Sequence, residues 1–201
     1  WSYFNMSNSR DISKFKNSKL HGSLILSFLN PYILTSNEIK KSKYALNFHP
    51  ALPKYPGRDP QHFSKYNQED VIGATLHKII ASVDSGPIID VIEKRIDPKT
   101  NVAQIDSICS KLAYQLLLKN AQNILDGKIK TNEQLKWAHK NKKTRRDFIK
   151  MSKISPDMEK EEVDRRIEAF HVKEYKNKVH VEIQGRYFTF DEDFEKEIKS
   201  K

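Results

Sequence analysis

Residues 24–48, LILSFLNPYILTSNEIKKSKYALNF, contain two charge-free apolar segments with a short polar segment between them. Leu24–Phe28 and Tyr44–Phe48 have the length and composition of buried strands. Thr35 or Ser36 is a suitable N-cap for a short helix in the polar segment. A strand–helix–strand unit with such a crossover favours parallel strands. The stretch therefore predicts an α/β fold.

Later segments extend this pattern into a larger sheet and a separate tail. Strand candidates are Val71–Lys78 and Pro87–Lys94, helix candidates are Asn101–Asp126 and Glu159–Phe170, and Val179–Phe190 reads as a hairpin around Gln184 and Gly185. We predict a mostly parallel sheet within residues 1–130, and a small C-terminal extension with a helix and a β-hairpin in residues 131–201.

The composition excludes several classes of protein. The 201 residues include 37% hydrophobic and 31% charged residues, and no apolar run is long enough to cross a bilayer. One cysteine, Cys109, rules out a disulfide framework within the chain and favours the cytoplasm. The net charge of +10 suits nucleic acid or small polyanions, but most lysines alternate with acidic residues, so a solvated surface explains them equally well.

Polar residues of chemical interest follow the second strand and the third. Asn47 and His49 lie two residues apart at the end of a strand, so their side chains point to the same side. The proline-rich loop 49–60 begins there, and Asp84 lies in the turn between two later strands. An amide, an imidazole and a carboxylate suit acyl transfer to an amine: Asn47 would stabilise an oxyanion, and His49 would accept a proton. Each residue alone is as easily explained by a structural role.

Three segments resemble, in order and spacing, the signature of the folate-dependent formyltransferases: Leu46-Asn-Phe-His-Pro-Ala-Leu-Pro-Lys-Tyr-Pro-Gly57, Gly73-Ala-Thr-Leu-His77 and Val83-Asp-Ser-Gly-Pro-Ile88. The resemblance implies that Asn47, His49 and Asp84 are catalytic, that 10-formyltetrahydrofolate is the co-substrate and that no metal takes part. It also assigns the binding of the pterin ring to two loops, through Phe28, Leu29, Asn30, Tyr32, Ile33, Ile80, Ala81 and Asp84. It further implies that residues 1–130 form a Rossmann-like catalytic domain that is incomplete, because the family's N-terminal strands are missing before residue 24.

The tail resembles that of one branch of the family, the nucleotide-sugar N-formyltransferases. Thr144-Arg-Arg-Asp-Phe148 and Asp164-Arg-Arg-Ile-Glu-Ala-Phe-His171 are similar to their C-terminal pattern. The implied acceptor is a deoxythymidine-diphosphate (dTDP) aminosugar, 4-amino-4,6-dideoxyglucose, for O-antigen and lipopolysaccharide synthesis. The expected substrate contacts are His49, Lys54, Tyr55, Gly57, Arg58, Phe170 and Tyr175, with core packing as the alternative for Phe170.

Two other functions remain open on the sequence. Methionyl-tRNA formylation would explain the net charge of +10. A non-catalytic binding module would explain the missing strands. In the preferred reading there is neither a nucleic-acid nor a membrane partner, and the apolar hairpin at 179–190 makes a homodimer contact, because an isolated hairpin is marginally stable.

Overall fold

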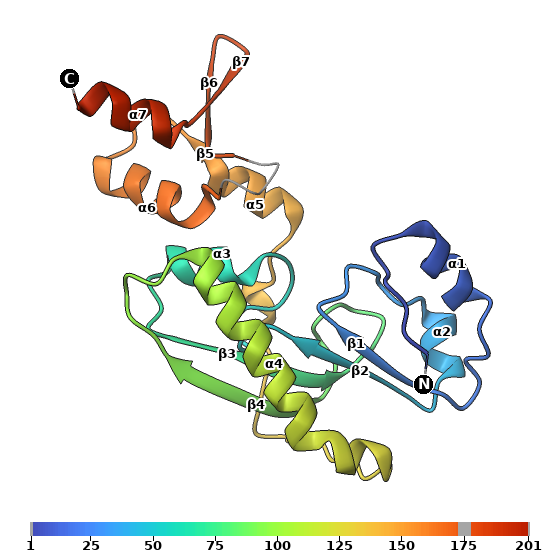
Figure 1. The fold of residues 1–201 in the computed structure, drawn as a ribbon. Coiled ribbons are helices and arrows are strands. Elements are labelled where there is room, and N and C mark those ends of the chain that lie inside the picture. Colours follow the sequence, from blue (N-terminus) through green and yellow to red (C-terminus); the bar gives the residue numbers. More distant parts are fainter. Residues whose placement is uncertain (1, 173–177, 201) are drawn as a thin grey trace.

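The computed structural model describes residues 2–172 and 178–200. Figure 1 shows a sheet with helices around it and a smaller C-terminal part above it. The sheet has four strands. The sheet has the order β1-β2-β3-β4. Its strands are β1 (Leu24–Phe28), β2 (Tyr44–His49), β3 (Val71–Lys78) and β4 (Ile88–Arg95), and the accompanying helices are α1 (Ser9–Lys16), α2 (Ser36–Lys41), α3 (Pro60–Tyr66) and α4 (Val102–Leu125).

The α/β class and the parallel β1–β2 pair are confirmed, but the expectation of a mostly parallel sheet is wrong. β2 pairs with β3, and β3 with β4, in antiparallel fashion. The connection that contains α3 stays at the end of the sheet where β2 finishes. β3 therefore starts there and runs back beside β2, with His49 opposite Thr75.

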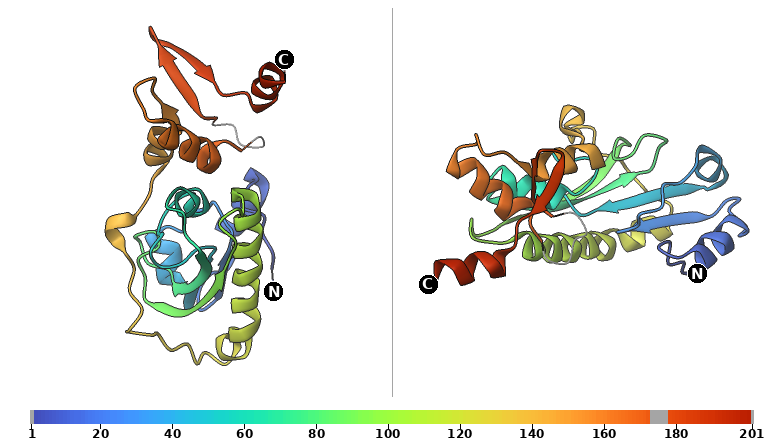
Figure 2. Two further views of the ribbon diagram at one scale, coloured as in Figure 1. Left: turned by 90° about the vertical axis from the view of Figure 1, so that its left-hand side faces the viewer. Right: turned by 90° about the horizontal axis from the view of Figure 1, so that it is seen from above.

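The long helix α4 covers one face of the sheet. Alternate residues of the two central strands point towards it, and this core contains Leu46, Phe48, Ala74, Leu76, Leu112, Ala113 and Leu116. Because side chains alternate along a strand, Asn47 and His49 must point to the opposite face. Figure 2 shows, on that face, a connection that runs from the end of α4 to the C-terminal part.

The C-terminal part contains short elements. They are a 3₁₀ turn (His139–Asn141), α5 (Arg145–Ser152), β5 (Lys153–Ile154), α6 (Lys160–Phe170), β6 (His180–Ile183), β7 (Arg186–Thr189) and α7 (Glu192–Lys199). The predicted hairpin is confirmed, since β6 and β7 are antiparallel and Gln184 and Gly185 have φ angles of 49° and 73°. Two positive φ angles are what a type I′ turn requires.

The C-terminal part shares a core with α3. Phe63 of α3 packs in one core with Phe148 and Phe170. The ring centroid of Phe170 lies 5.4 Å from that of Phe63 and 5.4 Å from that of Phe148. Side chains on both sides of the predicted boundary at residues 130 and 131 therefore depend on one another. Within the described ranges, none of the helices combines the length and apolarity that crossing a membrane requires.

Candidate active site

The face of the sheet opposite α4 carries a row of polar side chains. In the antiparallel register Asn47 lies opposite His77, and His49 lies opposite Thr75. Directly opposed residues in such a pair are close enough to touch. Two neighbouring strands thus bring Asn47, His49 and His77 to one patch of the sheet.

Asp84 completes the cluster from above the sheet. It lies in the loop between β3 and β4, residues 79–87, which we call the aspartate loop. Its Oδ2 is 3.5 Å from Nδ1 of His49, and its Oδ1 is 3.4 Å from Nε2 of His77. The backbone N–H of Gly57 donates to Oδ2 at 2.8 Å, and Asn47 Nδ2 lies 3.1 Å from Nε2 of His77. The three residues predicted from the sequence therefore converge, joined through His77.

Both ring nitrogens of His49 face acceptors. Nε2 lies 2.9 Å from the carbonyl oxygen of Tyr55, which can only accept, so Nε2 carries a proton in this contact. Only 5% of His49 is exposed. Burial lowers the pKa of His49, against the opposing effects of the Asp84 charge and the Tyr55 carbonyl. The imidazole is therefore neutral at neutral pH.

Asp84 is held as a carboxylate. Burial raises its pKa, but the contacts with His77 and His49 and the hydrogen bond from the Gly57 N–H together lower the pKa below its ordinary value. Its φ angle of 45° lies in the left-handed region, which aspartate tolerates better than most residues. A buried carboxylate on a strained backbone position is typical of a functional site.

His77 and Trp137 are the two members of the site that the sequence analysis did not identify. His77 was part of a predicted strand, and the alternation Thr75, His77 was the available signal. Its place beside Asn47 follows only from the pairing register of β3 with β2. Trp137 is nearly buried, and its ring lies edge-on to His77 and His49 at centroid distances of 4.9 and 5.8 Å. No sequence signal linked Trp137 to residues fifty or more positions earlier.

The residues expected to bind the pterin lie in two loops. Phe28, Asn30 and Tyr32 line a cavity of about 680 Å³ beside β1, within the size range of ligand sites, although no residue of the polar cluster lines it. Leu29, Ile33, Ile80 and Ala81 expose side chains to solvent. Exposed aliphatic groups can pack against a flat ring, which would remove them from water. The roles of these eight residues remain predictions.

The residues of the proline loop (residues 50–59) do not all face the site. The side chain of Tyr55, an expected substrate contact, points away from the site. It is buried, and its hydroxyl donates to Glu69 at 2.7 Å. Only the backbone carbonyl of Tyr55 reaches His49. Lys54 points outward and pairs with the same Glu69. Gly57 contacts Asp84, and the exposed Arg58 pairs with Asp59. Of the two cationic side chains, neither contacts the cluster.

Phe170, also expected to contact the substrate, is a core residue instead. It is fully buried, and its ring stacks on His62 with an interplanar angle of 18°, in the core shared with α3. The alternative of core packing accounts for it, and a buried ring has no face to offer a nucleotide base. Tyr175, the remaining expected contact, lies outside the described residues.

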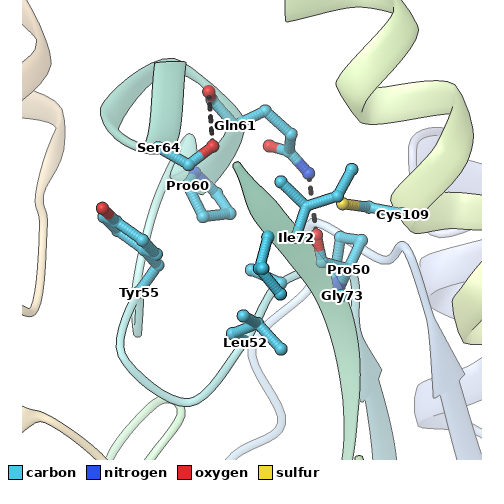
Figure 3. A pocket seen from close by; sticks show the side chains of 11 residues that line it. Pro50, Leu52, Tyr55, Pro60, Gln61, Ser64, Ile72, Gly73 and Cys109 are labelled. Carbon is cyan, nitrogen blue, oxygen red and sulfur yellow. Dashed lines mark hydrogen bonds between the residues drawn. The ribbon is translucent and has the colours of Figure 1, made fainter. Parts of the chain in front are cut away.

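The proline loop is anchored by close packing rather than by a ligand cavity. Figure 3 shows Leu52, Ile72 and Cys109 beside the loop. The space that they help to line is only about 10 Å³, roughly enough for one water molecule. Gln61 Nε2 donates to the carbonyl of Pro50 at 3.1 Å there. Burial raises the pKa of Cys109 to about 12, so its thiol is not a nucleophile.

No group of three or more metal-ligating side chains that could hold an ion occurs in residues 2–172 and 178–200. The donor set of the cluster, an amide, two imidazoles and one carboxylate, is arranged for hydrogen bonding among its own members.

Comparisons with known proteins agree with this geometry. The family model described as formyl transferase matches residues 25–120. A methionyl-tRNA formyltransferase of Lactobacillus acidophilus is 31% identical over 117 residues, which cover 57% of this chain and 37% of the relative. The chain thus spans little more than a third of the length of that curated relative.

Two solved structures have a similar fold. A 4-N formyltransferase from Francisella tularensis has a TM-score of 0.71 at 24% identity, covering 84% of this chain and 69% of the other. An N-formyltransferase from Helicobacter canadensis, solved with folinic acid and dTDP-3-aminofucose, has a TM-score of 0.63 at 26% identity, covering 80% and 58%. The formyl transferase model matches residues 25–120, slightly less than half of the chain, and this stretch contains all four members of the polar cluster.

Proposed function

We propose that the protein transfers a formyl group from 10-formyltetrahydrofolate to the primary amine of a nucleotide-linked aminosugar. The observation that carries the proposal is the convergence of Asn47, His49, His77 and Asp84 on one face of the sheet. The Helicobacter canadensis structure, with its folate analogue and aminosugar nucleotide, supports both classes of substrate. The acceptor we propose is dTDP-4-amino-4,6-dideoxyglucose, whose product would enter O-antigen or another surface glycan.

The residues can carry out each step of such a transfer. When bound, 10-formyltetrahydrofolate supplies the formyl carbon, which forms a bond to the acceptor amine and loses its bond to the folate nitrogen. The amide N–H of Asn47 would donate to the formyl oxygen as negative charge grows on it. His49 would accept the proton that the attacking amine loses and pass it to the leaving nitrogen. Asp84, ionised beside both imidazoles, would stabilise the cation formed.

His49 must change its contact before it can act. Its Nε2–H donates to the Tyr55 carbonyl, and its Nδ1 faces Asp84, so neither nitrogen is directed to an amine. Catalytic hydrogen bonds often form only in the complex with substrate. We propose that substrate binding moves either the imidazole or the Tyr55 segment of the proline loop, and that the half-buried Asn47 marks the open side of the site.

The pH dependence follows from the burial of His49. A base acts in its neutral form, and burial keeps the pKa of His49 below the ordinary value of 6.5. As the pH falls, activity should therefore persist to below 6.5 and then decline as His49 takes up a proton. Measurement of kcat/KM from pH 5 to pH 9 checks this, and an acidic limb with a midpoint above 7 would exclude His49 as the buried base.

Transfer to methionyl-tRNA is the second candidate, because the Lactobacillus acidophilus relative carries that name and the net charge is +10. One assay distinguishes transfer to an aminosugar from transfer to methionyl-tRNA. The protein is given 10-formyltetrahydrofolate together with a panel of aminosugar nucleotides and methionyl-tRNA. We expect mass spectrometry to find the formyl adduct on a dTDP-aminosugar. An adduct on tRNA alone would replace the proposal, and none on any acceptor would favour a binding module.

We also propose that the hairpin forms a homodimer contact. Val181, Ile183 and Phe188 share one face of the hairpin by register, and Ile183 and Phe188 are about half exposed. Exposed apolar groups of this kind are typical of association surfaces.

The dimer is expected in light scattering at micromolar concentration. Ile183→Asp combined with Phe188→Asp should give a monomer, since two charges would be buried without partners. Tyr187→Asp, at an exposed position on the other face, is the matched control and should remain dimeric. A monomeric wild-type protein would refute the contact.

A further inference from the structure

The connection after α4 takes part in the site. Its residues 137–143, which we call the strap, cross the sheet face opposite α4 (Figure 2). The strap bonds to the proline loop in several places along its length. Ala138 N donates to Pro53 O at 3.0 Å, Asn141 Nδ2 to Lys54 O at 3.2 Å, Lys143 N to Pro56 O at 3.1 Å and Arg58 N to Lys143 O at 2.9 Å.

The strap also bonds to the aspartate loop, on both sides of Asp84. Lys142 Nζ donates to the carbonyl of Val83 at 2.6 Å, and Trp137 Nε1 donates to the carbonyl of Gly86 at 2.7 Å. The positive φ of Asp84 is unfavourable for a residue with a side chain, so neighbouring contacts must hold it. The first hydrogen bond holds the peptide group between Val83 and Asp84, and the second holds the peptide group between Gly86 and Pro87, two residues further on.

Trp137 reaches the imidazoles as well. Its ring plane is inclined by 86° to His77 and by 64° to His49, which are edge-to-face arrangements. With 8% of its surface exposed, the indole keeps water from this side of both rings. The same side chain therefore sets the orientation of two histidines and the position of the loop that carries their carboxylate.

We propose that Trp137 is a positioning residue for the formyl-transfer site, acting through the aspartate loop and the two imidazoles. The inference rests on the proposed function for its effect on turnover. The geometry itself, a single indole in contact with both histidines and hydrogen-bonded two residues beyond Asp84, exists without substrate. The strap thus belongs to the catalytic unit and not to the C-terminal extension.

Two substitutions separate the hydrogen bond from the packing. Trp137→Phe keeps an aromatic ring against the histidines but leaves the Gly86 carbonyl unpaired, and we expect kcat to fall about 10-fold. Trp137→Ala removes both, and kcat should fall about 100-fold, the effect of an active group displaced by about 1 Å. The KM for the folate should change little. Lys142→Ala should lower kcat several-fold, whereas Lys130→Ala, at an exposed position before the strap, should not.

A measurement without substrate distinguishes positioning from general loss of structure. NMR titration of the assigned histidine ring protons gives the pKa of His49 in the ligand-free protein. In Trp137→Ala water reaches the ring, so this pKa should rise towards 6.5 while the melting curve stays cooperative. Wild-type kcat in Trp137→Phe together with an unchanged His49 titration in Trp137→Ala would overturn the proposal. A shifted titration in a protein that formylates nothing would refute the proposed function alone.

Discussion

Asp84→Asn should lower kcat by two to four orders of magnitude, the usual effect of removing a group that supports a catalytic base. The carboxylate is within 3.5 Å of both imidazoles, and asparagine would present a neutral group in its place. The Gly57 N–H can still donate to the amide oxygen of asparagine, so the loop should keep its position. Steady-state rates of formyl transfer, measured by mass spectrometry of the acceptor, give the ratio of kcat in the variant to kcat in the wild type.

The control for this substitution is Asp90→Asn. Asp90 is a partly buried carboxylate on β4 that pairs with Lys119 at 2.8 Å, and it does not contact the cluster. We expect kcat within a factor of two of the wild-type value. If Asp84→Asn retained most of its activity while Asp90→Asn lost it, the assignment of the catalytic carboxylate would be wrong.

Phe170→Ala should reduce the free energy of unfolding by about 3–5 kcal/mol, as found for large aromatic side chains removed from a core. Phe170 is fully buried and packs against Phe63, Phe148 and His62. Because these contacts join α6 to α3, the substitution should also loosen the C-terminal part. Urea unfolding followed by circular dichroism gives the difference between variant and wild type.

Phe188→Ala is the matched control, since the same side chain is 52% exposed on the hairpin. The substitution should lower the free energy of unfolding by no more than about 0.5 kcal/mol when it is measured on the monomeric form. Should Phe170→Ala leave stability unchanged and raise the KM for the nucleotide sugar, the ring would be a ligand contact after all.

The sequence predicted helices and strands best where a segment carries a clear local signal, such as an apolar run or a helix cap. Leu24–Phe28 and Val71–Lys78 have the bounds of β1 and β3, and Thr35 caps α2 through a capping box with Glu38. α1, α5 and α7 were not predicted, although Thr144 and Asp147 form a readable capping box before α5. Helices of eight residues are stabilised mainly by tertiary contacts, such as the burial of Phe148, which local sequence does not reveal.

Local spacing placed Asn47 and His49 correctly, because alternation along a strand depends on the chain itself. His77 required the antiparallel register of β2 with β3, which depends on the folded sheet and not on a local motif. Tyr55 was assigned from a motif that gives no side-chain direction, and its hydroxyl points to Glu69. Contacts made by a long connection, such as that of Trp137 with Gly86, depend on the complete fold.

We propose that the cluster of Asn47, His49, His77 and Asp84 moves a formyl group to a sugar amine. The decisive test is a single-turnover experiment with 10-formyltetrahydrofolate that carries an isotopically labelled formyl carbon, run on wild type and Asp84→Asn side by side. Wild type should pass the label to the amine of a dTDP-aminosugar, whereas the variant, equally folded, should not do so within the same time. Equal transfer of the label by both proteins, or by neither, would refute this role of the cluster.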